Sequence, residues 1–190
     1  MGTQNIHKKK GSSDEMRKDV RFSCYPFMRE KTSLVDFEIR TDSLTTRIGS
    51  AMAVVKNNIV LTDLQIILPM AYHVNGSVRG KLAVTEEDLA WLSNRYDFYV
   101  SHVEDMIRGF VLPCGGEEAS RLHICRSEAK KSYRTLHKVS EEREVPEILF
   151  DYLGLLANVF FVMAVFCNKE NGIGEIPFIS KSYPMKKVTK

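Results

Sequence analysis

Apolar residues recur at intervals of three and four along much of this chain, which is the spacing of one face of an α-helix. The first such stripe consists of Leu44, Ile48, Ala51 and Val55. Thr41 and Asp42 precede it, and either side chain suits a helix N-cap. The pattern therefore predicts a first helix that begins near residue 42.

The next two helices are marked by different signals. The apolar stretch IVLTDLQIILPMAYHV predicts a helix to about Val74, with Pro69 as a kink or a boundary. Asn75-Gly76-Ser77 is typical of a turn. Thr85 is followed by three acidic residues, as in an N-cap and first helical turn. The third helix then carries the apolar stripe Leu89, Leu92, Tyr96, Tyr99 and Val103.

Two more helices follow. The segment from Pro113 to Gly116 interrupts the chain before a fourth helix over about 117–138. Pro146 suits the start of a fifth helix, which runs to about Asn168. This helix is apolar on nearly all sides, but its most apolar stretch, 152–167, is shorter than a membrane span and is interrupted by Asn158, so we expect a buried core helix. Since the only strand candidates are short, at 35–39 and 176–180, the predicted class is an all-α helical bundle.

Length and charge indicate one domain with tails. We expect a basic N-terminal arm over 1–33, a helical domain over 34–172 and a C-terminal tail over 173–190. The net charge of +3 comes from the two ends, and the part between them is mildly acidic. This distribution argues against nucleic-acid binding, which concentrates Lys and Arg on a folded surface.

The cysteines indicate a reducing compartment. The chain has four cysteines without a C-x-x-C pair, and no apolar signal segment at its start, so we expect a cytoplasmic protein that does not enter a membrane. His123 and Cys125 lie two positions apart, and side chains so spaced on a helix point in nearly opposite directions. We therefore expect no metal site at these residues.

Arg126 occupies an unusual place in the fourth helix. It falls within the apolar stripe of that helix, and together with Lys130 and Arg134 it forms a row with a spacing of four residues. A buried arginine keeps its charge and needs a carboxylate, a phosphate or water. The row lies beside the Gly115-Gly116 turn, so it could receive a polyphosphate; alternatively, Arg126 closes a structural ion pair and the other two residues are solvated.

Residues 110–134 resemble the signature of the PduO-type ATP:cob(I)alamin adenosyltransferases. The resemblance rests on FVLPCGG, on L-H-x-x-R ending at Arg126, on Lys130-Lys131 and on Arg134. It extends upstream to TDSLTTRIGSA and TEEDLAWL, and downstream to DYLGLLANVFFVMAVFCNKENG. It thus covers about residues 36–172, most of the expected bundle.

The resemblance implies a fold and a reaction. The fold would be a five-helix bundle of the cobalamin adenosyltransferase type, assembled as a homotrimer with active sites between subunits. The reaction would transfer the 5′-deoxyadenosyl group of ATP to cob(I)alamin or a related corrinoid, with Mg²⁺ assisting and triphosphate released. The product could pass to an adenosylcobalamin-dependent enzyme.

The resemblance also assigns roles to single residues. Phe110 would occupy the lower corrinoid face and displace the axial ligand of cobalt. Arg126 would contact the nucleotide and be held by Asp42, with Lys130 beside it as a third residue of the catalytic set. Further contacts would come from Arg134, from Asn158 and from an N-terminal segment that is weakly similar to the family's phosphate loop. The residues of this segment are Lys8, Lys10, Gly11 and Ser12.

Several positions depart from the family pattern and bear on activity. Lys130 stands in place of a second arginine, and Tyr133 in place of a glutamate. In the fifth helix, Gly154, Leu155 and Asn158 replace an asparagine, an arginine and an aspartate. Besides the enzyme, the sequence therefore leaves open a non-catalytic carrier or sensor of the same fold that binds a corrinoid or nucleotide. A helical interaction protein without a ligand is a third reading.

Overall fold

The computed structural model describes residues 20–107 and 109–182, and the chain divides into two units at residues 31 and 32. In the first unit, the 3-10 helix η1 (Val20–Phe22) precedes Tyr25 and Phe27, whose rings meet edge to face at 5.7 Å. The second unit contains all five α-helices found in the described residues. The predicted all-α class is confirmed.

Helix α2 (Ser33–Met52) begins well before Thr41 and Asp42, so the predicted start of the first helix is wrong. The expected strand at 35–39 is also wrong, because these residues are helical and bury Phe37 completely. Glu142, which lies 109 positions further along the chain than Ser33, holds the actual start of the helix in place. Both carboxylate oxygens of Glu142 accept from the Ser33 N–H at 3.1 Å, a contact that no local pattern reveals.

Helix α3 (Asn58–Ser77) contains Pro69 without ending there. It also runs through Asn75-Gly76-Ser77, so the predicted turn is wrong. The Asn75 amide explains the extension, since its Nδ2 donates to the Glu38 carbonyl at 2.6 Å and to Thr41 Oγ1 at 2.7 Å on α2. Helix α4 (Glu86–Val103) begins as predicted, with a reciprocal capping box between Thr85 and Asp88.

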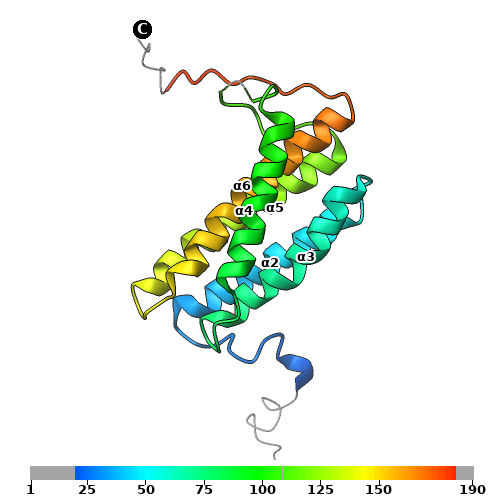
Figure 1. Ribbon diagram of the computed structural model, residues 1–190. Coiled ribbons are helices and arrows are strands. Elements are labelled where there is room, and N and C mark those ends of the chain that lie inside the picture. The colour runs from blue at the N-terminus through cyan, green and yellow to red at the C-terminus, as the bar shows by residue number, and fades with distance from the viewer. Residues whose placement is uncertain (1–19, 108, 183–190) are drawn as a thin grey trace, which may run out of the picture. The chain divides into compact units, whose positions relative to one another are not determined.

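Helices α5 (Glu117–Ser140) and α6 (Glu147–Glu170) confirm the last two predicted helices. Helix α5 packs on α2 and α6, α6 packs also on α4, and α2 packs also on α3 (Figure 1). Helix α6 is long and apolar enough to cross a membrane, but 61% of its most apolar window is buried within the bundle. The bundle thus uses α6 as its central core helix.

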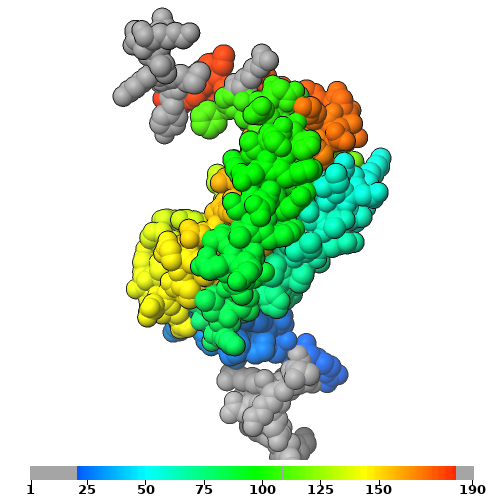
Figure 2. All heavy atoms as spheres, in the orientation of Figure 1, coloured from blue at the N-terminus to red at the C-terminus, as the bar shows by residue number. Residues whose placement is uncertain are grey.

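One end of the bundle brings together two segments that are distant in sequence. Figure 2 shows the α4–α5 loop and the C-terminal segment at the same end of the helices. Val111 forms an isolated antiparallel bridge with Pro177, which is all that remains of the expected strand at 176–180. This end therefore combines the start of the FVLPCGG motif with the residues that follow α6.

Candidate functional site

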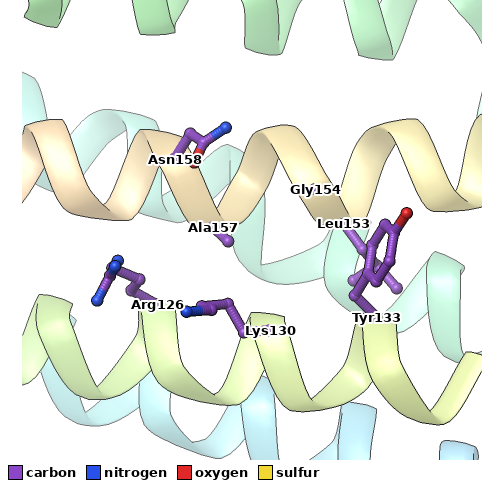
Figure 3. A pocket seen from close by; sticks show the side chains of 7 residues that line it. All are labelled: Arg126, Lys130, Tyr133, Leu153, Gly154, Ala157 and Asn158. Atoms are coloured by element: carbon purple, nitrogen blue, oxygen red, sulfur yellow. The ribbon is translucent and has the colours of Figure 1, made fainter. Parts of the chain in front are cut away.

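A hollow of about 300 Å³ lies between α5 and α6. Its polar residues are Arg126 and Lys130 from α5 and Asn158 from α6. The remaining lining residues are small, aliphatic or aromatic: Tyr133, Leu153, Gly154 and Ala157. Figure 3 shows the side chains of Arg126 and Lys130 on α5 facing α6 across this space. The structure thus brings three of the predicted site residues together in one hollow: Arg126, Lys130 and Asn158.

Arg126 is half-buried at the edge of the core, with its guanidinium carbon 5.4 Å from the centre of the Phe161 ring. No carboxylate in the described part of the chain forms an ion pair with it. The ring of Phe161 supplies a cation–π contact, which compensates only part of the lost solvation. Arg126 therefore presents a positive charge to the hollow, and among the described residues it does not close the structural ion pair that the sequence left open.

Two adjacent lysines of α5 have different roles. Lys131 Nζ donates to Glu128 Oε1 at 2.7 Å, and Arg40 of α2 donates to the other oxygen of this carboxylate at 3.3 Å. Burial would raise the pKa of Glu128, but the hydrogen bonds from Lys131 and Arg40 outweigh it and lower that pKa. Lys130 faces the hollow with no ion-pair partner among the described residues. Lys131 thus holds the Glu128 carboxylate that Arg40 links to α2, whereas Lys130 is available to an anion.

Tyr133 forms the apolar end of the hollow. Its ring meets Phe150 edge to face at 5.5 Å. A Cβ placed on Gly154 would lie 3.6 Å from its Cε2, an ordinary contact distance. Tyr133 and Gly154 therefore fit one another, at positions where the family pattern has two polar side chains. Arg134, the third member of the predicted row, is exposed on α5 and is not among the lining residues.

A second hollow, of about 230 Å³, adjoins the first at Arg126 and Asn158, which line both. Phe110 lies at its rim, with 78% of its surface exposed. Phe161 and Val111 complete the wall between α6 and the α4–α5 loop. An exposed phenylalanine beside two cation-bearing hollows is what a site for a large, flat ligand requires.

The turn before α5 is held by Asn168, whose role the sequence prediction missed. Asn168 Nδ2 donates to the Cys114 carbonyl at 3.0 Å, and its Oδ1 accepts from the Gly116 N–H at 3.0 Å. Gly115 has φ +128, and a Cβ there would collide with the Asn168 amide. The segment DYLGLLANVFFVMAVFCNKENG, which resembles the family, contains this residue, but only the fold shows that Asn168 contacts the Gly-Gly turn.

Asp42 does not pair with Arg126 in the structure, so that expectation fails within one chain. Asp42 lies on the exposed side of α2 toward α3, where its Oδ1 accepts from the Tyr72 hydroxyl at 2.8 Å. This hydrogen bond, together with the charge of Asp42, raises the pKa of Tyr72. Arg126 instead faces α6. Lys8, Lys10, Gly11 and Ser12 lie outside the described residues.

Comparison with known proteins identifies the family. The sequence model of the cobalamin adenosyltransferases matches residues 15–167. The corrinoid adenosyltransferase of Bacillus subtilis (strain 168) is 30% identical over 146 residues, which are 72% of this chain and 75% of that protein. The chain belongs to the cobalamin adenosyltransferase family.

More distant members agree with this assignment. The corrinoid adenosyltransferase MMAB of Mus musculus is 26% identical over 148 residues, 71% of this chain and 62% of that protein. A variant PduO-type ATP:corrinoid adenosyltransferase from Lactobacillus reuteri, solved with cobalamin and ATP, has a TM-score of 0.72 at 18% identity, covering 79% of this chain and 88% of that one. The predicted fold, the family and the enzyme class that it defines are confirmed.

Proposed function

We propose that this protein transfers the 5′-deoxyadenosyl group of ATP to the reduced cobalt of a corrinoid. The observation that carries the proposal is the joined pair of hollows. On one side lie two cations, Arg126 and Lys130, that pair with no carboxylate in the described part of the chain, and on the other side lies the exposed Phe110. Unpaired cations suit a polyphosphate, and an exposed aromatic ring suits the face of a macrocycle. The two ligands would meet near Arg126 and Asn158.

The proposed reaction is a nucleophilic displacement at C5′ of ATP. The cobalt of the cob(I)alamin substrate donates its electron pair to C5′, a Co–C bond forms, the C5′–O bond breaks, and triphosphate leaves with that bond's electrons. Arg126 and Lys130 stabilise the negative charge of the departing group, and the walls of the hollows hold C5′ in line with cobalt. Phe110 occupies the lower corrinoid face and excludes an axial ligand, which favours reduction of the metal.

Mg²⁺ would reach the site bound to the triphosphate. Within residues 20–107 and 109–182, no group of three or more His, Cys, Asp or Glu side chains is arranged to hold a metal ion. Magnesium commonly binds through substrate phosphates and waters together with one or two carboxylates. The N-terminal segment containing Lys8, Lys10, Gly11 and Ser12 is proposed to contact the same phosphates, and Arg134 to add charge at the outer end of the row.

We further propose a homotrimer with its sites between subunits. Asp42 and Arg126 face different neighbouring helices of one chain, so a direct pair between them would require two copies. Such a pair would give the exposed carboxylate of Asp42 a cationic partner, and it would give an anionic one to Arg126, which has none within the described residues. The free thiols of all four cysteines support a cytoplasmic location, from which the product could be handed to an adenosylcobalamin-dependent enzyme.

The activity is tested by mixing the purified protein with ATP, Mg²⁺ and chemically reduced cobalamin. We expect the spectrum of adenosylcobalamin to appear and triphosphate to be released in equal amount. An Arg126→Ala variant is the matched negative control, since it removes the central cation. Corrinoid binding without product would instead support the non-catalytic carrier or sensor.

Mixing two inactive variants tests whether sites lie between subunits. Asp42→Ala and Arg126→Ala would each be inactive alone. When the two are refolded together, a site that takes Asp42 from one copy and Arg126 from the other is intact, so a fraction of the activity should return. No recovery, with mixed oligomers demonstrated, would exclude a pair between copies.

The non-catalytic alternative is favoured by one specific observation. On α6, the wall of the first hollow is formed by Leu153, Gly154, Ala157 and the neutral Asn158, and on α5 Tyr133 closes its end. Charged groups that other members use near the nucleotide are therefore absent from this wall. The carrier or sensor would bind a corrinoid at Phe110, and the addition of ATP would leave the spectrum of the bound corrinoid unchanged.

A further inference from the structure

The first hollow, between α5 and α6, changes in character along its length. Its two cations, Arg126 and Lys130, extend their charged ends toward the end that adjoins the second hollow, beside Asn158 (Figure 3). The opposite end is formed by Tyr133 of α5 and by aliphatic or small residues of α6. A ligand that fills this hollow should therefore carry negative charge at one end and a flat, apolar group at the other.

The ring of Tyr133 is held from two directions. Phe150 meets it edge to face at 5.5 Å and does not line the hollow, so this contact supports the ring from outside. Gly154 lies along the ring, since a Cβ on it would be 3.6 Å from Tyr133 Cε2 and 3.8 Å from Cδ2. Figure 3 shows the ring standing between the two helices. With 39% of its surface exposed, Tyr133 leaves one side of the ring open to the hollow.

The size and lining of the hollow limit what lies inside it. Its volume of about 300 Å³ is at the lower end of the range for small-molecule sites, about 300–1,000 Å³. A nucleoside would fill this space, and a triphosphate attached to it would extend past the cations. Among the described residues that line the hollow, Tyr133 has the only aromatic ring, and Leu153, Gly154 and Ala157 bring no side-chain hydrogen-bonding group. The apolar end therefore suits a flat aromatic base.

We infer that Tyr133 and Gly154 form a nucleobase subsite, in which the adenine of ATP stacks on the Tyr133 ring. This inference rests on the proposed function, which brings ATP to the first hollow. Along the axis of α5, Tyr133 lies about 4.5 Å from Lys130 and about 10 Å from Arg126. A base at the ring therefore directs the phosphates of the same molecule to the cations, and C5′, which lies between base and phosphates, comes near the junction of the two hollows.

The subsite joins two departures from the family pattern. Tyr133 stands in place of a glutamate, and Gly154 stands in place of an asparagine. An asparagine side chain at position 154 would extend beyond a Cβ that is already in contact with the ring, so it would push the ring aside. The two exchanges therefore depend on one another: together they replace polar groups by a stacking surface and leave the cations of the hollow in place.

The subsite is tested by titrating the full-length protein with ATP and with inorganic triphosphate, which has no base. Tyr133→Leu removes the ring and keeps an apolar side chain. We expect its ATP affinity to fall about tenfold, because base stacking is lost, and its triphosphate affinity to stay unchanged. Lys130→Ala should weaken both ligands. Tyr96→Leu, at a half-buried tyrosine of α4 outside the hollow, is the matched control.

Three more variants separate the ring from its surroundings. Tyr133→Phe keeps the ring without the hydroxyl and should bind ATP as the wild type does. Gly154→Ala adds a methyl group at an ordinary contact distance from the ring, so ATP affinity should stay unchanged. Gly154→Leu should displace the ring and weaken ATP binding as much as Tyr133→Leu does. Unchanged triphosphate affinity shows that each variant is folded.

The outcomes distinguish this inference from the proposed activity. If Tyr133→Leu weakens ATP and triphosphate equally, or weakens neither, the base does not lie on Tyr133 and the inference is wrong. It is also wrong if Tyr133→Leu binds ATP more tightly, because the ring then obstructs the hollow, or if it weakens cobalamin binding alone, because the ring then holds the base of the corrinoid. If the expected ATP pattern is found but the wild type forms no adenosylcobalamin, the activity fails and the subsite stands.

Discussion

Arg126 on α5 lies over the ring of Phe161 on α6, 5.4 Å from guanidinium carbon to ring centre, and no carboxylate within residues 20–107 and 109–182 pairs with it. This arrangement explains how a stripe of core residues can include an arginine. The ring supports the side chain from one direction, and the hollow leaves its charged end open. Binding and stability should therefore respond differently to its removal.

Replacing Arg126 by Ala should weaken ATP binding by about ten- to a hundredfold, because a charge-assisted hydrogen bond is lost. The free energy of unfolding should change by less than about 1 kcal/mol, since no buried carboxylate is left unpaired. Calorimetric titration with ATP and urea unfolding measure the two effects. Lys138→Ala, an exposed cation in the last turn of the same helix, is the control. A large loss of stability with normal ATP affinity would contradict the assignment.

Lys130→Arg should raise ATP affinity by about two- to tenfold, because a planar guanidinium binds a phosphate through two hydrogen bonds where an ammonium acts as a point charge. The same change at Lys131 should instead leave ATP affinity unaltered, since Lys131 pairs with Glu128. Titration of both variants with ATP gives the comparison. An equal response at the two positions would show that only the overall charge of α5 matters.

Gly115→Ala should destabilise the fold by about 1–3 kcal/mol, because φ +128 is unfavourable for alanine and its Cβ would displace the Asn168 amide. Gly174→Ala is the control, as Gly174 has an ordinary φ and open space around its Cα. The midpoint of urea unfolding measures both variants. Asn168→Ala should show a comparable loss, since it leaves the Gly116 N–H without its acceptor.

His123 should make stability depend on pH. Burial, with a smaller contribution from the charge of Arg126, lowers the pKa of His123 to about 4. In the unfolded chain the pKa of His123 is near 6.5, so below that pH the unfolded chain binds more protons than the folded one. The contribution of the neutral His123 to the free energy of unfolding is therefore fully present above about pH 6.5 and is lost as the pH falls toward 4. The loss amounts to at most about 3 kcal/mol.

The substitution His123→Phe should remove this part of the pH dependence. It also removes two buried ring nitrogens that have no hydrogen-bond partner in the described structure, so the variant should be more stable at every pH. Urea unfolding between pH 4.5 and 7.5 provides the curves. Parallel curves for wild type and variant would show that His123 does not titrate as expected.

The fold could be predicted where its signals are local. The capping box at Thr85 and Asp88 involves residues three positions apart, and the apolar surface of α6 is continuous. The start of α2 could not be predicted, because Glu142 supplies its cap from the connection between α5 and α6. The end of α3 depends in the same way on the contact of Asn75 with α2.

The site could likewise be predicted where its signals are local and not where it depends on contacts between distant elements. The positions of Arg126 and Lys130 follow from helical spacing, and the family motif supplied Phe110 and Asn158. The contacts of Asn168 and Phe161 were not predictable, since each lies on α6 and acts on a residue of another element. Asp42 and Arg126 do not meet within one chain, which the motif could not reveal, because a motif states which residues belong together and not whether they meet within one copy.

Asn168 also makes the site depend on the number of residues in α6. Its amide reaches the Gly-Gly turn and Glu175 only in the direction set by the helical register that begins after Pro146. Removing one residue within α6 would rotate everything beyond the deletion by about 100° and shift it by about 1.5 Å. Related chains should therefore tolerate exchanges of side chains along α6 far more readily than any insertion or deletion. The length of the helix sets the distance between the two ends of the site.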